Sequence, residues 1–311
     1  MSGRFEHQVH IDRVVKDNLK DFPPILNEYY KRSSGMQSSS RHVVMNNVKR
    51  FFLYNEEKGT DIFNNDWLKK VTADDIVEYF FDIKVRTLKN GKQKVLSDST
   101  IATMLHHLDN FFTFRVKQKY IDDNPITEAM EYFPKYKVKK RVVYMTPEEV
   151  NHVKETIASE SPYPCRDLCI FMLGCRTGLR QSAITEIDIS DIDFENMSIQ
   201  VVEKGNVYKD VLIDPDTLRL IRECINERGN IPGEDALFIR FSNGKRITAW
   251  DMRVLLDTYA IDLNKRITPH KMRSTCGTNL YEKTGDIFLV ADRLGHTNIQ
   301  NTKRYVDTLK K

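Results

Sequence analysis

The sequence predicts a mainly α-helical protein with one small β-sheet, divided into two domains. Three observations predict this fold class. The chain has 311 residues, and at about 150 residues per domain this length corresponds to roughly two domains. Apolar residues recur at helical spacing through most of the chain. Two short strand-like runs flank Gly205-Asn206 in the second half, so the sheet is expected there.

The composition is that of a globular protein with enough apolar material for real cores, at 40% hydrophobic and 30% charged residues. No stretch approaches the roughly 18 apolar residues of a membrane helix, and the N-terminus lacks the apolar run of a signal peptide. The five cysteines are an odd set without framework spacing, and no second Cys or His pair follows Cys165 and Cys169 at zinc spacing. We therefore expect a cytoplasmic protein with reduced thiols, no metal site and no membrane segment.

The first half is predicted to be a series of helices. Serines at 38–40 precede an apolar pattern that ends at Gly59, so they are expected to cap a helix. Residues 72–75 and 97–99 are typical caps of two further helices, and Asn124-Pro125 is expected to end this region. The aromatic residues of these helices are expected in the core rather than as platforms for stacking on bases. They are Phe51, Phe52, Phe80, Phe81, Phe111, Phe112 and Phe114.

Positive charge is concentrated in the first half. Residues 1–141 carry 25 Lys and Arg against 19 Asp and Glu, whereas residues 142–311 carry 23 against 25. Such a basic half is expected of a protein that touches a polyanion, although solvated helix faces give the same count. Around the turn signal Asn90-Gly91 a basic hairpin or loop is predicted, which either contacts phosphates or lies in solvent. Its basic residues are Lys84, Arg86, Lys89, Lys92 and Lys94.

A basic linker is predicted between the two domains. The segment 135–141 holds four lysines and one arginine after Pro134, which is typical of an interdomain connection and suits a clamp around a duplex. A helical domain is therefore expected over 18–134 and a mixed domain over 142–311. The second domain opens with Thr146-Pro147 and two glutamates, a strong helix start. The candidate phosphate contacts in the linker are Lys137, Lys139, Lys140 and Arg141.

In the second half, the runs SIQVVEK and YKDVLID joined at Gly205-Asn206 predict a β-hairpin. No phosphate loop of the form G-x-x-x-x-G-K-[ST] occurs, which disfavours an ATP-driven machine. His270 and Arg273 follow Pro269 at a predicted helix start. Because they lie three residues apart, they share a helix face near the positive helix end, where a phosphate is a natural guest. The same spacing at His10 and Arg13 has no companions and is interpreted as surface.

Two further clusters carry candidate reactive groups. Arg180 follows Gly178 at the end of an apolar helix, and the glycine permits a bend that could aim the arginine inward. His296 and Tyr305 are nine residues apart, so on one continuous helix they would lie on opposite faces. Gly295 predicts a break between two helices instead, and this break would let both side chains reach one pocket.

The order and spacing of these clusters resemble the catalytic domain of the tyrosine recombinases, also called phage integrases. Three stretches are similar to the conserved boxes of that family, namely TGLRQSAITEIDISDID, TPHKMRSTCGTNLYEKTGD and RLGHTNIQNTKRYVD. The stretch SDSTIATMLHHLDNFFTFRVKQKYIDDNPI resembles the last helices of the family's core-binding domain. The resemblance covers roughly residues 20–308 and points to Xer-like site-specific recombinases and integrases.

The resemblance implies a SAM-like helical core DNA-binding domain over 18–134 and a mixed α/β catalytic domain over 142–311. It implies a site-specific recombinase that cleaves and rejoins DNA through a covalent 3′-phosphotyrosine, without ATP, metal or other cofactor. A phosphotyrosine conserves the energy of the phosphodiester, which agrees with the missing phosphate loop. The implied partners are double-stranded DNA with inverted half-sites and further copies of this chain, as a tetramer on DNA. The sequence identifies no accessory protein.

Four residues match the family's phosphate-binding groups. Arg180 and Arg273 match the paired arginines on the scissile phosphate, where planar guanidinium forks suit the charge of a pentavalent phosphate. His270 and His296 match the two residues that hydrogen-bond the phosphate and assist proton transfer.

Two residues match the groups that make and break bonds. Tyr305 matches the nucleophile that joins the DNA 3′-phosphate, and its weakly acidic hydroxyl needs nearby cations or a base. Lys204, on the predicted hairpin, matches the lysine that protonates the leaving 5′-oxygen.

The sequence departs from the family pattern at a few positions. Ala183 stands where the family usually has Glu, and Glu186 is the expected substitute. Ser274 stands where His is frequent. Six residues follow Tyr305, where many relatives carry a longer segment that docks on a neighbouring subunit. Three alternatives stay open: a type IB topoisomerase, a telomere-resolving enzyme, and an inactive DNA-binding module.

Overall fold

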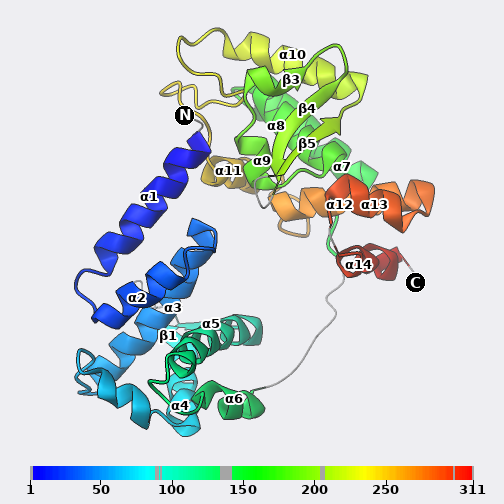
Figure 1. The fold of residues 1–311 in the computed structure, drawn as a ribbon. Coiled ribbons are helices and arrows are strands. Elements are labelled where there is room, and N and C mark those ends of the chain that lie inside the picture. Colours follow the sequence, from blue (N-terminus) through cyan, green and yellow to red (C-terminus); the bar gives the residue numbers. More distant parts are fainter. Residues whose placement is uncertain are drawn as a thin grey trace. The chain divides into compact units, whose positions relative to one another are not determined.

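The computed structural model describes residues 3–87, 91, 93–133, 142–203, 207–296 and 298–309. The chain divides into two compact units, Met1–Val138 and Lys139–Lys311, and their boundary falls within the range 135–141 that the sequence assigns to a linker. Helices dominate both units, and the larger sheet belongs to the second unit (Figure 1). The fold class predicted from the sequence is confirmed.

The first unit packs its helices around an aromatic core. Phe51, Phe52, Phe111 and Phe112 are fully buried, and their rings meet edge to face, the arrangement that aromatic quadrupoles favour. Phe81 departs from the prediction, since 79% of its surface is exposed. The elements are α1 (Gly3–Asn18), α2 (Pro24–Arg32), α3 (Ser38–Glu57), η1 (Asn65–Lys70), α4 (Ala73–Ile83), β1 (Val85–Thr87), β2 (Gln93–Val95), α5 (Asp98–Lys117), α6 (Pro125–Ala129) and η2 (Met130–Tyr132).

The helix caps of this unit mostly follow the sequence. Thr72 caps α4 and Ser97 caps α5, each accepting a hydrogen bond from a backbone N–H of the first turn. Asn124 does more than end a region, because it caps α6. The prediction of a serine cap for α3 is wrong. The helix begins at Ser38 itself, whose hydroxyl donates to Asp12 Oδ2 of α1 at 2.9 Å.

The basic hairpin predicted in this unit is confirmed. Strands β1 and β2 pair antiparallel, and Gly91 lies between them with φ +76°, a left-handed conformation that glycine adopts without strain. Lys84 and Lys94 are exposed on it. Arg86 lies in β1, whereas Lys89 and Lys92 lie outside the described residues.

The second unit combines helices with an antiparallel sheet of order β3-β4-β5. Strands β4 and β5 form the predicted hairpin, with Ser198 opposite Leu212, whereas β3 was not predicted because it has only two residues. The elements are α7 (Pro147–Glu160), α8 (Pro164–Thr177), α9 (Gln181–Thr185), η3 (Ile189–Asp191), β3 (Ile192–Asp193), β4 (Ser198–Glu203), β5 (Val207–Leu212), α10 (Pro215–Arg228), α11 (Ala249–Tyr259), α12 (Pro269–Thr284), α13 (Ile287–Leu294) and α14 (Gln300–Leu309).

Helix α8 is the centre of the second unit. It contacts α7, α10 and α12, and its run from Cys169 to Cys175 is buried all round, as expected of a helix without a polar face. At Gly174 a Cβ would meet Met272 Cε at 2.6 Å, so glycine permits the close approach of α8 and α12. This packing brings the end of α8 beside the start of α12, where the predicted reactive residues lie.

A search of the described helices for a membrane span found none with both the length and the apolar character to cross a bilayer.

Candidate active site

Four of the six predicted catalytic side chains line one pocket of about 630 Å³ in the second unit. They are Arg180, His270, Arg273 and His296. The other lining residues are Gln181, Arg253, Thr268, Pro269 and Arg304. Among these described lining residues there are four arginines and no carboxylate, so the pocket is suited to an anion.

Helix α12 presents the first pair of side chains. Thr268 caps this helix by accepting a hydrogen bond from the Lys271 N–H, and Pro269 occupies its first turn. His270 and Arg273 lie three residues apart on it and face the same pocket, as the sequence predicts. The positive end of the helix dipole adds to the attraction for an anion at this position.

The bend at Gly178 brings Arg180 to the pocket. Gly178 ends α8 with φ +67°, and a Cβ there would meet Leu294 Cδ2 at 2.5 Å, so a larger residue would clash with α13. Arg273 Nη1 donates to the Gly178 carbonyl at 2.6 Å, and its Nη2 donates to the carbonyl of Leu294. The turn after α8 and the end of α13 are thus held together by one guanidinium.

The arginine pair combines a buried guanidinium, that of Arg273, with the half-buried one of Arg180. Arg273 is 4% exposed, and burial together with the charge of Arg180 lowers its pKa to about 10. Burial also lowers the pKa of Arg180, whose Nη2 lies 3.5 Å from the Gly295 carbonyl. Both groups remain protonated at neutral pH. A phosphate between them would neutralise two cations that repel one another.

Both histidines are kept neutral. Burial, followed by the charge of Arg273, lowers the pKa of His296 to about 4. Partial loss of hydration, followed by the charges of Arg304 and Arg273, lowers the pKa of His270. His296 Nδ1 lies 2.9 Å from the Thr302 hydroxyl, so its ring orientation is fixed from α14. A neutral imidazole can both donate and accept a proton, which phosphoryl transfer requires.

Tyr305 lies on α14 and is 0% exposed. The predicted helix break is confirmed, since α13 ends at Leu294 and Gly295 follows with φ +58°. The Tyr305 ring lies parallel to the His296 ring, with centroids 6.3 Å apart. At Gly277 of α12 a Cβ would meet Tyr305 Cζ at 3.1 Å, so the glycine makes room for the ring.

Three residues that hold this arrangement were not identified from the sequence. Arg304 Nη2 donates to the Tyr305 hydroxyl at 3.2 Å, Thr302 contacts His296, and Gly277 accommodates the tyrosine ring. The dipeptide Arg304-Tyr305 was the available signal for the first. The other two depend on contacts between α12, α13 and α14, which no local pattern reveals.

Several predicted site residues are not brought together by the described structure. Lys204 and the linker candidates Lys137, Lys139, Lys140 and Arg141 lie outside the described residues. Ala183 is buried in α9, and Glu186 is not among the residues that line the pocket. The expected substitute for the family glutamate therefore does not line the site.

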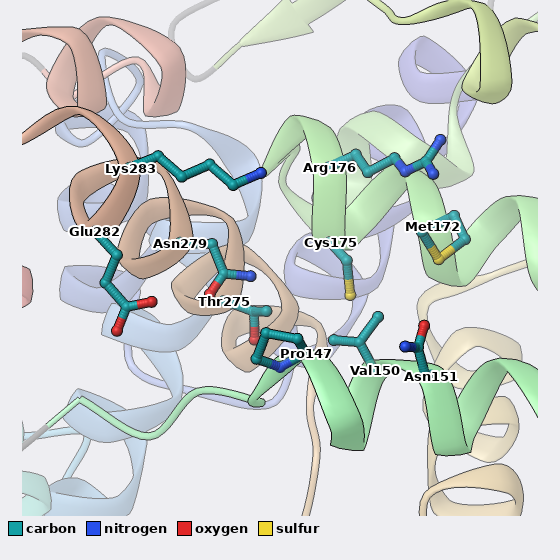
Figure 2. A pocket seen from close by; sticks show the side chains of 10 residues that line it. All are labelled: Pro147, Val150, Asn151, Met172, Cys175, Arg176, Thr275, Asn279, Glu282 and Lys283. Atoms are coloured by element: carbon teal, nitrogen blue, oxygen red, sulfur yellow. The ribbon is translucent and has the colours of Figure 1, made fainter.

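A second cavity, of about 280 Å³, lies between α7, α8 and α12. Figure 2 shows Pro147 and Val150 below it, Cys175 and Met172 on α8, and Asn279 facing it from α12. None of the predicted catalytic residues lines this cavity. The groups suited to phosphate chemistry therefore gather in the larger pocket.

Comparisons with known proteins agree with this geometry. Residues 143–311 match the model of the phage integrase family. Tyrosine recombinase XerC of Shewanella amazonensis is 29% identical over 213 residues, which cover 68% of this chain and 70% of that protein.

Two solved structures share the fold. The Tn1549 transposon integrase in complex with circular intermediate DNA has a TM-score of 0.68 at 21% identity, covering 91% of this chain and 94% of that one. The XerH recombinase bound to palindromic difH substrate has a TM-score of 0.67 at 19% identity, covering 92% and 81%. Because the family match spans more than half of the chain, the protein belongs to the phage integrase family, the tyrosine recombinases.

Proposed function

We propose that the pocket lined by Arg180, Arg273 and the two histidines cleaves and rejoins DNA strands, with Tyr305 as the nucleophile of a site-specific recombinase. The observation that supports this most directly is one cationic pocket lined by a buried guanidinium, a half-buried guanidinium and two neutral imidazoles, with the Tyr305 ring parallel to that of His296. Its residues come from three segments far apart in the sequence. Such a set suits a phosphodiester better than any other common substrate.

The arginines bind and polarise the scissile phosphate. Arg180 and Arg273 donate to its non-bridging oxygens, and His296 donates from the ring nitrogen that does not contact Thr302. These donors are already fixed by backbone carbonyls and by α14, so little reorganisation accompanies the attack. They stabilise the charge that gathers on a pentavalent phosphorus.

Two protons move during cleavage. The Tyr305 oxygen forms a bond to phosphorus and gives its proton to neutral His270. The bond between phosphorus and the 5′-oxygen breaks, and that oxygen takes a proton from Lys204. The products are a 3′-phosphotyrosine and a free 5′-hydroxyl. Rejoining is the reverse, with the incoming 5′-hydroxyl as nucleophile and tyrosine as leaving group, so no external energy source is consumed.

The DNA partner is proposed to carry inverted half-sites bound by copies of this chain, four of which assemble on two sites. A palindromic substrate is bound by XerH, a protein of the same fold. The first unit and the linker supply phosphate contacts through basic side chains, at Lys84, Arg86, Lys89, Lys92, Lys94, Lys137, Lys139, Lys140 and Arg141. The reaction is proposed to take place in the cytoplasm, on DNA.

The nucleophile assignment is tested by capturing covalent adducts. The chain and its Tyr305→Phe variant are expressed in cells that carry the native genome, the cells are denatured, and protein-linked DNA is sequenced. We expect adducts at one sharp locus for the native chain and none for the variant, while the variant still retards that DNA in a gel. Adducts of equal yield from both proteins would falsify the assignment. Adducts scattered without sequence preference would indicate a topoisomerase.

A further inference from the structure

Arg304 donates hydrogen bonds to Tyr305 and His270, the two groups between which the first proton of the proposed reaction moves. Its Nη2 lies 3.2 Å from the Tyr305 hydroxyl oxygen and 3.1 Å from His270 Nε2. Its guanidinium carbon lies 5.2 Å from the centre of the Tyr305 ring. The side chain also lines the pocket beside Arg180 and Arg273.

We infer that Arg304 is a further catalytic residue of this site, which aligns the Tyr305 oxygen with His270 and stabilises the phenolate as the attack begins. This inference rests on the proposed function, because it assumes that Tyr305 is the nucleophile. It assigns to Arg304 a task that differs from that of Arg180 and Arg273, which are anchored to backbone carbonyls of the surrounding turns.

The bond to His270 fixes the protonation state of the imidazole. An arginine is always a donor and never an acceptor, so His270 Nε2 must offer a lone pair to Arg304. That lone pair is the one that can receive the tyrosine proton. Burial, followed by the charges of Arg304 and Arg273, lowers the pKa of His270 and so disfavours a proton on it before substrate binds. The resting site therefore holds a base in its active form.

The bond to Tyr305 matters because water is excluded there. The tyrosine is 0% exposed, so charge on its oxygen must be compensated by protein groups rather than by solvent. When the proton leaves for Nε2, the imidazolium and Arg304 repel one another. The guanidinium then donates its hydrogen bond to the Tyr305 phenolate only, and the phenolate oxygen can bond to phosphorus. Reversal of the same steps returns the proton to tyrosine on rejoining.

The test is single-turnover cleavage of a nicked substrate that carries the captured site, at saturating protein. Arg304→Ala is expected to lower the first-order cleavage rate at pH 7.5 about 10²-fold, the loss typical when one charge-stabilising donor is removed. Arg304→Lys, which keeps the charge but loses the fork, is expected to recover at least a tenth of the native rate. The matched control is Lys303→Ala, which removes an exposed charge from the same helix and is expected to stay within twofold.

Two readouts separate this role from a structural one. The deficit of Arg304→Ala is expected to shrink as the pH rises from 7 to 9, a range below the pKa of about 10 of Arg273, because removal of the tyrosine proton by hydroxide then competes with its transfer to His270. A substrate with sulfur in place of the 5′-bridging oxygen needs no leaving-group proton. This substrate is expected to restore the cleavage rate of Lys204→Ala but not that of Arg304→Ala.

Three results would overturn the inference. They are an Arg304→Ala rate within twofold of native, a deficit that is independent of pH in both Arg304 variants, or a deficit that the sulfur substrate removes. If Arg304→Ala misfolds, its circular dichroism and its retardation of DNA will differ from those of Lys303→Ala. In that case the cleavage rate of Arg304→Lys decides whether the inference holds. If Tyr305→Phe itself still forms adducts, the proposed function fails, whatever the Arg304 variants do.

Discussion

At the residue scale, a few residues fix the positions of the candidate catalytic groups. Arg273 donates hydrogen bonds to the carbonyls that end α8 and α13, so its guanidinium is held in place beside the pocket. Thr302 fixes the ring of His296 through Nδ1. Gly277 lets the Tyr305 ring lie against α12. The cationic and imidazole groups are therefore fixed before DNA arrives, which is where electrostatic catalysis gains most, whereas Tyr305 is still buried.

His296 makes the stability of the second unit depend on pH. Its pKa is about 4 when folded, against about 6.5 in an unfolded chain. Between these values the unfolded state binds the proton and the folded state does not, so the free energy of unfolding falls as the pH drops from about 6.5 to about 4. Above pH 6.5 the contribution is fully present.

The expected result is a steeper loss of stability in the native chain than in His296→Gln, over pH 6.5 to 4.5. Urea unfolding followed by circular dichroism measures it, with both proteins compared at each pH. The other histidines are common to both proteins and cancel in the difference. Parallel stability curves for the two proteins would show that His296 is not held neutral.

At the element scale, most helix ends and hairpins follow from residues that are neighbours in the sequence. The features that the sequence did not predict depend on tertiary contacts. The caps at Thr72 and Ser97, the Gly295 break and both hairpins could be predicted because each depends on a few neighbouring residues. The start of α3 could not be predicted in this way, because the Ser38 hydroxyl donates to Asp12 of α1, a residue far away in the sequence. The meeting of α12 with α14 came only from a family resemblance, and the role of Arg304 came only from the structure.

The hairpin of β1 and β2 gives a prediction about DNA affinity. Lys84 and Lys94 are exposed on it and are proposed to bind phosphates. Replacing both by alanine is expected to lower the slope of log affinity against log salt by about 2, because each phosphate that a lysine neutralises contributes about 0.9 to that slope. Fluorescence anisotropy with a labelled duplex at several salt concentrations measures the slope.

The matched control removes two lysines whose charge is already compensated. Lys58 contacts Glu78 and Asp82, and Lys69 contacts Asp66, so Lys58→Ala with Lys69→Ala is expected to leave the salt slope unchanged. An equal change of slope in both double variants would mean that only net charge matters and that the hairpin makes no specific contact.

At the scale of the whole molecule, the candidate active site lies within one of the two units. Every described residue that lines the cationic pocket lies in Lys139–Lys311, and the first unit has its own aromatic core. The proposed catalytic groups for one strand lie within one chain, and one of them, Lys204, lies outside the described residues. Exchange of strands between two duplexes, with one nucleophile for each strand, needs four copies.

The number of copies on DNA is therefore a prediction of its own. Using Tyr305→Phe to prevent turnover, we expect two chains on one duplex with inverted half-sites and four when two such duplexes are joined. Mass photometry at increasing protein concentration counts them, and a duplex with a single half-site serves as the control. A complex that stays at one chain per full site would contradict the proposed assembly.

The burial of Tyr305 has a consequence for the genome that carries the recombination site. A genome offers roughly 10⁶ to 10⁹ non-specific binding sites for each correct one, so a DNA-binding protein spends much of its life on the wrong sequence. The cationic pocket faces any phosphate that it meets, but the tyrosine has no exposed surface. In the proposed reaction, contact of the pocket with a chromosome therefore does not by itself bring the Tyr305 oxygen and the DNA backbone together. On this proposal, the cell is spared strand breaks at the many places where the protein binds without its recombination site.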